Sequence, residues 1–187
     1  MNSDLFVVVG MIRSGTTYVD KVLNSSANCK CYSQPFAHLF RFFKECFLSD
    51  KSIYQPFPLH HLFNEQQYDS NDFVDYLIHK RVSLKQLIDL DKSYENWSGI
   101  IDRVPFNEFL KDEEEYSLFE ILMKFKEYFG EDVASIGFKE VLIEEYIPFF
   151  LSLKIKVVFV YRNVLDVFRS IYLGDGAKYI GNPIPYF

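Results

Sequence analysis

The sequence predicts an α/β fold in three layers, a parallel central sheet flanked by helices on both faces. Two continuous apolar runs, 6–12 (FVVVGMI) and 155–161 (IKVVFVY), have the length of strands and are too short to cross a membrane. A segment with helical periodicity follows each run, and strands that alternate with helices favour a parallel sheet. With 187 residues, 49% of them hydrophobic, the chain can bury a sizeable core, and we expect a single domain over 1–187.

Apolar residues at helical spacing predict the helices. In 16–24, Val19, Val22 and Leu23 share one face. The segment 35–47 (PFAHLFRFFKECF) carries a dense aromatic stripe, which we expect to pack on the sheet rather than to bind a substrate molecule. One or two helices are predicted over 71–90, with Asp69, Ser70 or Asn71 as the cap, and others over 111–129, 143–151 and 163–172. The charged run 111–115 is expected to open its helix, because acidic side chains are favoured in the first turn.

The remaining segments predict strands and a loop. Besides the first apolar run, we expect strands over 97–104, closed by Pro105, and over 134–139. The run 155–161 is expected to be a buried strand, because it is apolar almost throughout. The polar stretch 24–28 is expected to be a loop.

Two glycines bound the loop between the first strand and the first helix. Four residues separate Gly10 from Gly15, so backbone N–H groups can turn inward beside the positive end of the helix. In a nucleoside triphosphatase with this spacing a lysine would stand where Thr16 stands here. The cation is instead Arg13, whose planar guanidinium suits a bidentate grip on an oxyanion. The pattern predicts a phosphate-binding loop; a plain strand-to-helix turn with a capping serine is the alternative.

Charge and cysteine content exclude some classes of partner. A net charge of −6 gives no general footprint for DNA or RNA, so any anion site must be local. The three cysteines do not have the spacing of a zinc site, and we expect reduced thiols in a cytoplasmic protein. The first strand follows directly on MNSD, which leaves no room for a signal peptide, and no membrane span is expected.

A second basic position follows the second apolar run. Arg162 comes directly after 155–161, and Ser170 lies two helical turns further on, so both can face one anion. Taken together, RSGTT (13–17), GFKE (137–140) and VVFVYRNVLDVFRS (157–170) resemble the PAPS-dependent sulfotransferases, where PAPS is 3′-phosphoadenosine-5′-phosphosulfate. The resemblance implies a P-loop-like sulfotransferase architecture and PAPS as co-substrate, with no metal.

The resemblance also implies roles for individual residues. It assigns the 3′-phosphate to Arg162 and Ser170, and the sulfuryl group in transfer to Lys139. It assigns the 5′-phosphosulfate to the first loop, namely Arg13, Ser14, Gly15, Thr16 and Thr17. Sulfuryl transfer moves a nearly neutral group in line between two oxygens, so positioning and fixed positive charge can carry it, as in phosphoryl transfer.

The reaction needs a general base that takes the proton of the acceptor, and the residues that serve as this base in the family are replaced here. Where some relatives carry a glutamate this chain has Gln34, and where others carry a histidine it has Val141. Glutamine cannot act as a base at neutral pH. The remaining candidates are Glu140 and His38, followed by the pair His60 and His61. For each of them a capping or surface role is the alternative.

The acceptor is expected to be a hydroxyl or an amine of a small molecule or carbohydrate. Sulfotransferases usually continue beyond the Arg162–Ser170 helix, so we expect the C-terminal part of the family domain to be missing, which would weaken donor binding or abolish activity. Two other functions stay open. One is a P-loop nucleotide kinase or hydrolase, and the other is a truncated, non-catalytic sulfotransferase-like interaction protein whose aromatic surface pairs with another chain. For a kinase or hydrolase, Asp102 is the one candidate magnesium ligand after a strand, and a packing or capping role for it is favoured.

Overall fold

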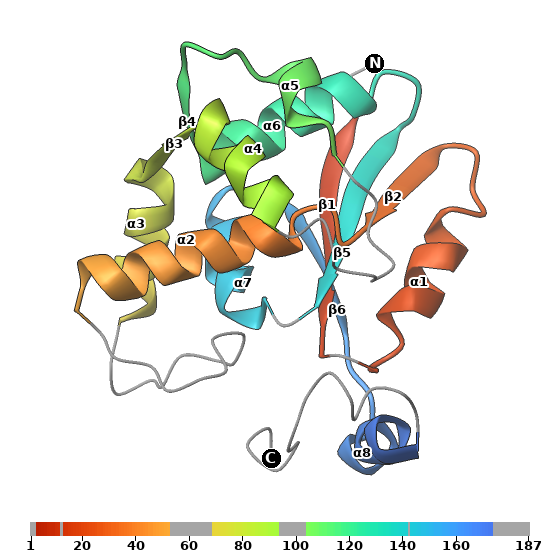
Figure 1. Cartoon of the computed structure of the whole chain (residues 1–187). Helices are drawn as coiled ribbons and strands as arrows, with labels where there is room; N and C mark the ends of the chain where they lie inside the picture. The colour runs from red at the N-terminus through yellow and green to blue at the C-terminus, as the bar shows by residue number, and fades with distance from the viewer. Residues whose placement is uncertain (1–2, 12, 53–68, 94–103, 142, 174–187) are drawn as a thin grey trace.

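A four-stranded parallel sheet forms the centre of the protein (Figure 1). The structure is a computed structural model that describes residues 3–11, 13–52, 69–93, 104–141 and 143–173. Within these ranges the strand order is β2 (Cys29–Ser33), β5 (Ser135–Val141), β1 (Asp4–Gly10) and β6 (Lys156–Val160). Every pairing in this sheet is parallel, so all four carboxyl ends lie at the same edge. The predicted α/β class, with helices flanking a parallel sheet, is confirmed.

Alternation along β1 distributes its side chains between the two faces. Val7 and Val9 point into the larger core, which is covered by α2 (Ala37–Asp50), α3 (Ser70–His79), α4 (Leu84–Ser93), α6 (Leu118–Phe129) and α7 (Ile147–Ser152). Phe6 and Val8 point to the opposite face, where α1 (Thr16–Leu23) packs. The buried apolar run of β1 is therefore explained by its central position, with partner strands on both sides and helices on both faces.

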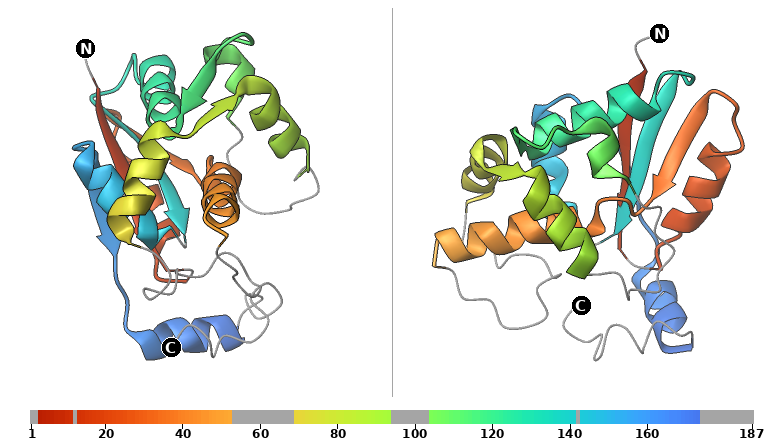
Figure 2. Two further views of the ribbon diagram at one scale, coloured as in Figure 1. Left: turned by 90° about the vertical axis from the view of Figure 1, so that its left-hand side faces the viewer. Right: turned by 45° about the horizontal axis from the view of Figure 1, so that its top comes forward.

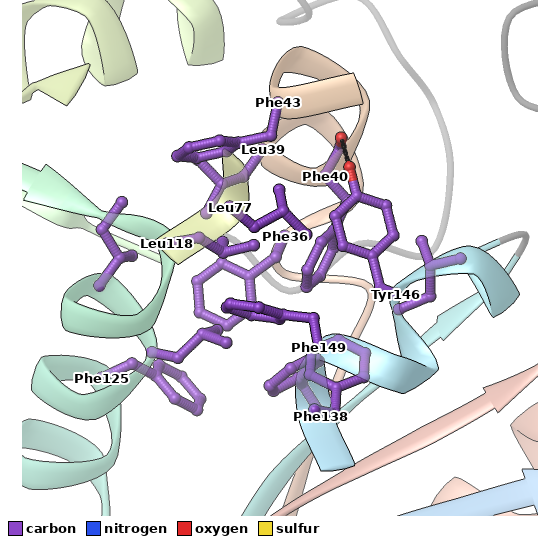
Figure 3. Packing of buried hydrophobic residues seen from close by; sticks show 14 of the residues in the cluster. Phe36, Leu39, Phe40, Phe43, Leu77, Leu118, Phe125, Phe138, Tyr146 and Phe149 are labelled. Atoms are coloured by element: carbon purple, nitrogen blue, oxygen red, sulfur yellow. Dashed lines mark hydrogen bonds between the residues drawn. The ribbon is translucent and has the colours of Figure 1, made fainter. Parts of the chain in front are cut away.

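Aromatic rings fill the larger core (Figure 3). The Phe36 ring meets that of Phe138 edge-on at 5.1 Å between centroids, and Phe40 meets Tyr146 at 4.9 Å. Such edge-to-face pairs stabilise the core beyond the area they bury. The hydroxyl of Tyr146 donates to the backbone carbonyl of Phe40, so the polar end of this buried ring is satisfied. The aromatic stripe on 35–47 packs on the sheet, as predicted.

The strand β6 differs from its prediction, because it lies at the edge of the sheet and is not buried. Phe159 is 53% exposed and Val158 is 38% exposed. The sequence alternates little here, so apolar content alone did not distinguish an edge strand from a central one. The helix α8 (Val164–Leu173) follows β6 and lies beyond the carboxyl ends of the strands, apart from the helices that cover the sheet (Figure 2).

The prediction for 111–115 is also wrong, since this run does not open a helix. The strand β4 (Glu115–Ser117) pairs antiparallel with β3 (Arg81–Ser83), and α6 starts after it. A capping box fixes that start. The Ser117 hydroxyl accepts a hydrogen bond from the backbone N–H of Glu120, and the Glu120 carboxylate accepts one from the backbone N–H of Ser117. Local capping thus takes precedence over the preference of acidic residues for a first turn.

Three more short elements were not predicted, and one prediction cannot be compared. The missed elements are β2, β3 and the single turn α5 (Phe106–Phe109), all with too few apolar residues to show a period. The strand β3 divides the predicted segment 71–90 into α3 and α4, and Asp69 caps α3 by accepting the amide of Asn71 at 2.8 Å. In the segment predicted as a helix over 143–151, the turn η1 (Glu144–Tyr146) precedes α7, which begins at Ile147. The strand predicted over 97–104 lies, except for Val104, outside the described residues.

A matched pair of phenylalanine variants tests which side chains hold the fold. Phe138→Ala removes a fully buried ring and should lower the free energy of unfolding by about 3–5 kcal/mol. Phe159→Ala removes an exposed ring from the edge strand and should cost less than about 1 kcal/mol. Urea denaturation measures both. Equal losses for the two variants would contradict the assignment of β6 to an open edge.

Candidate functional site

The loop after β1 has the backbone that a phosphate cradle needs. Gly15 precedes α1 with φ of 107°, a left-handed conformation that glycine adopts without strain. The first amides of α1, those of Thr16 and Thr17, have no acceptor within the helix. These N–H groups carry the positive end of the helix dipole, which favours an anion at this position.

Close packing fixes the path of the chain into this loop. A Cβ on Gly10 would lie 2.7 Å from the Val160 carbonyl oxygen and 2.8 Å from the Ser14 hydroxyl oxygen, so only glycine fits there. Ser14 is buried, and its hydroxyl has no hydrogen-bond partner among the described residues. An unpaired buried hydroxyl costs free energy, which is recovered if a ligand provides an acceptor. Thr16 is buried and Thr17 is exposed.

The two basic motifs meet in space. Arg13 Nε donates to Ser170 Oγ at 2.9 Å, across 157 positions of sequence. Arg162 Nη1 donates to the carbonyl oxygen of Arg13 at 3.3 Å. Arg13, Arg162 and Ser170 therefore form one group beyond the ends of β1 and β6, with both arginines exposed.

Lys139 and Glu140, neighbours at the end of β5, lie on opposite faces of the sheet. Lys139 pairs with Val8 and Ser33 on the face that α1 covers, and it is 2% exposed. Glu140 pairs with Val9 on the face of the larger core. Because successive strand residues alternate, these two side chains cannot approach one reacting atom from the same side.

The carboxyl group of Glu140 caps the start of α2. Its Oε1 accepts the amide of Phe36, the N-cap residue of that helix, at 2.7 Å. The other oxygen, Oε2, has no partner among the described residues. Burial raises the pKa of Glu140 from 4.5 to about 8, although the bond from Phe36 and the charge of Lys139 both act to lower it. The capping role, the alternative considered for this residue, is present in the structure, and its role as a base stays a prediction.

The structure describes three of the other positions considered for the general base, those of Gln34, His38 and Val141. His38 is half-buried in the first turn of α2. Gln34 has a left-handed backbone, φ 53°, and its backbone N–H donates to the backbone carbonyl of Lys139 at 2.7 Å. Val141 pairs with Gly10 at the ends of β5 and β1. His60, His61 and Asp102 lie outside the described residues.

A buried ion pair between Lys44 and Glu145 was not predicted from the sequence. Lys44 Nζ lies 2.6 Å from Glu145 Oε1, and both side chains are almost fully buried between α2 and the turn η1. Burial raises the pKa of Glu145, while Lys44 opposes that shift. The only sequence signal is a lysine within the aromatic face of 35–47, where an unpaired charge would be costly.

Comparisons with family models, with curated proteins and with solved structures give no match to this chain. Among the described residues, no helix is long and apolar enough to cross a membrane. The same part of the chain holds no cluster of three or more His, Cys, Asp or Glu that could bind a metal ion. The cysteines Cys29, Cys31 and Cys46 form no disulfide bond. The geometry of the site therefore has to carry the functional assignment.

The raised pKa of Glu140 predicts how stability depends on pH. Between about pH 5 and pH 8 the unfolded chain loses this proton while the folded protein keeps it, so the free energy of unfolding should fall as pH rises, by several kcal/mol in total. Glu140→Gln keeps an oxygen for the Phe36 amide but cannot ionise, and it should lose most of this slope. Urea denaturation at pH 5, 6, 7 and 8 measures the effect.

The exposed Glu127→Gln is the matched control and should follow the wild-type pH dependence. If Glu140→Gln shows the same slope as the wild type, Glu140 is ionised in the folded protein and its assigned environment is wrong.

Proposed function

We propose that this protein transfers a sulfuryl group from PAPS to a hydroxyl or amine of a small molecule or carbohydrate, on a P-loop-like sulfotransferase architecture. The supporting observation is the contact of Arg13 with Ser170, beside Arg162. Two motifs that bind opposite ends of PAPS in the family resembled here thus come together at one sheet edge. The strands β1 and β6 are neighbours in the sheet, so the residues that follow them lie close together, and here those residues include two arginines and a serine in contact.

The proposed site for the 5′-phosphosulfate is the start of α1. The amides of Thr16 and Thr17 supply donors and the helix dipole, and the Ser14 hydroxyl supplies a buried donor that has no other partner in the described residues. Fixed donors of this kind need no rearrangement during the reaction, which is the basis of electrostatic catalysis.

The transfer itself follows from in-line geometry. The acceptor oxygen or nitrogen attacks sulfur, the bond from sulfur to the 5′-phosphate oxygen breaks, and adenosine 3′,5′-bisphosphate leaves. In the proposal, Lys139 stabilises the charge on the transferring group from the α1 face of the sheet. The acceptor proton passes to a base, for which Glu140 and His38 remain the candidates. Glu140 could take the proton only when ionised, and burial disfavours that state at neutral pH. Glu140 would have to act from the other face, because its strand neighbour Lys139 occupies this one.

A second candidate function, non-catalytic association with another chain, is favoured by one observation. Large apolar side chains are exposed around β6 and the start of α8, namely Leu151, Val158, Phe159, Tyr161, Val164 and Leu165. Large apolar side chains that are exposed in one part of a protein can mark an interaction site, although Val158 and Phe159 point to opposite faces of β6. Binding of nucleotide without sulfation of any acceptor, together with a stable complex in solution, would favour this candidate.

Ligand preference tests the proposed function. Adenosine 3′,5′-bisphosphate should raise the melting temperature more than ADP, because only the bisphosphate carries a 3′-phosphate for Arg162 and Ser170. Arg162→Ala should erase that preference. Arg169→Ala removes the same charge from an exposed position next to Ser170 and should leave the preference in place. Thermal denaturation with each ligand at equal concentration is the measurement.

A larger shift with ATP and magnesium than with the bisphosphate would reject the proposal in favour of a P-loop kinase or hydrolase. Equal loss of the preference in Arg162→Ala and Arg169→Ala would show that only overall charge matters.

A further inference from the structure

We propose that Arg13 is a specificity-determining residue that binds the 3′-phosphate of an adenosine nucleotide together with Arg162 and Ser170. The 5′ group is then left to the loop amides and Ser14. The inference rests on the proposed function and moves Arg13 to the other end of the nucleotide from the one implied by the sequence motif.

The contact with Ser170 carries this assignment. Arg13 Nε and Ser170 Oγ are 2.9 Å apart, so a phosphate that binds Ser170 also comes within reach of the guanidinium of Arg13. A guanidinium has five N–H donors in a planar fork, and the bond to Ser170 uses one of them. Within the described ranges no other acceptor is bonded to this guanidinium, which leaves its Nη groups for a bidentate contact.

The backbone of Arg13 holds the second arginine beside it. Arg13 has φ of 65°, a conformation that a residue with a Cβ rarely adopts. Its carbonyl oxygen accepts from Arg162 Nη1 at 3.3 Å. The loop is therefore connected to α8 through the side chain of Arg13, and to Arg162, two residues beyond β6, through the Arg13 carbonyl.

Charge at this position favours a dianion. No salt bridge among the described residues involves Arg13 or Arg162, although the chain as a whole carries a net charge of −6. Two uncompensated guanidinium groups next to one hydroxyl match a phosphate monoester, which carries about −1.5 to −2 charges at pH 7 and three acceptor oxygens. A single Arg162–Ser170 pair would provide only half of that positive charge.

Three nucleotides distinguish the two ends. Isothermal titration calorimetry compares 5′-AMP, 3′-AMP and adenosine 3′,5′-bisphosphate on the wild type and on Arg13→Ala. The variant keeps a Cβ and so the same backbone strain, and it keeps the carbonyl that Arg162 contacts. A charge-assisted contact is worth roughly 10- to 100-fold in affinity. Arg13→Ala should therefore weaken the binding of 3′-AMP and of the bisphosphate by that factor, and the binding of 5′-AMP by less than about threefold.

Two further variants complete the experiment. Arg13→Lys retains the charge but not the fork, and it should lie between the wild type and Arg13→Ala for the bisphosphate. Arg169→Ala, the neighbouring exposed arginine, should leave all three affinities within about threefold. Thermal denaturation of each variant without ligand reports whether the fold is retained, and Arg13→Lys replaces Arg13→Ala if it is not.

The outcomes separate this inference from the proposed function. If Arg13→Ala weakens the binding of 5′-AMP and of 3′-AMP equally, the side chain lies at the 5′ group or between the two phosphate sites. That result overturns this inference and leaves the proposed function standing. No weakening of any nucleotide overturns it as well. A wild-type protein that binds the bisphosphate no better than 5′-AMP overturns the proposed function itself.

Discussion

Parallel pairing of β1 with β5 on one side and β6 on the other is the constraint on which the rest of the structure depends. The register aligns Gly10 with Val141 and with Val160, so three strands end at one level. The loop with Arg13 follows one of these ends and Arg162 follows another. Residues 149 positions apart in the sequence are thereby brought to one edge of the sheet.

The packing on either side of this sheet separates structural from chemical tasks. On the larger face, Glu140 is built into the aromatic core, where it holds the amide of Phe36 and so fixes the start of α2. On the opposite face, the one that α1 covers, the side chain of Lys139 lies beside Val8. The helix α1 itself begins at the glycine-bounded loop. A buried carboxyl with a raised pKa is expensive to ionise, which favours its use as a neutral cap at neutral pH.

Long elements with a clear period could be predicted from the sequence, whereas several short elements and the exposure of the edge strand could not. The core strand β1 and the helices α2 and α6 bury a continuous apolar face, so their patterns are strong. The exposed edge at Phe159 could not be predicted, because whether a strand has one neighbour or two is decided by the whole chain. The start of α6 at Leu118 could have been found from Ser117 and Glu120, whose spacing is that of a capping box.

The candidate site shows the same division. The glycine spacing and the two arginines are local signals, and the sequence sufficed to select Arg13, Arg162 and Ser170. Which side chain faces which group depends on tertiary contacts, so the bond between Arg13 and Ser170 had to come from the structure. The separation of Lys139 from Glu140 follows from strand alternation, and it was missed because the predicted strand ended at residue 139 whereas β5 continues to Val141. The pairing of Lys44 with Glu145 is of this second kind too, since 101 positions lie between the partners.

A crystal structure of the protein with adenosine 3′,5′-bisphosphate tests the central claim most directly, because it locates both phosphates at once. The account predicts one phosphate on the amides at the start of α1 and the other among Arg13, Arg162 and Ser170. A nucleotide bound away from the carboxyl ends of β1 and β6, or Arg13 and Ser170 found far apart, would contradict it.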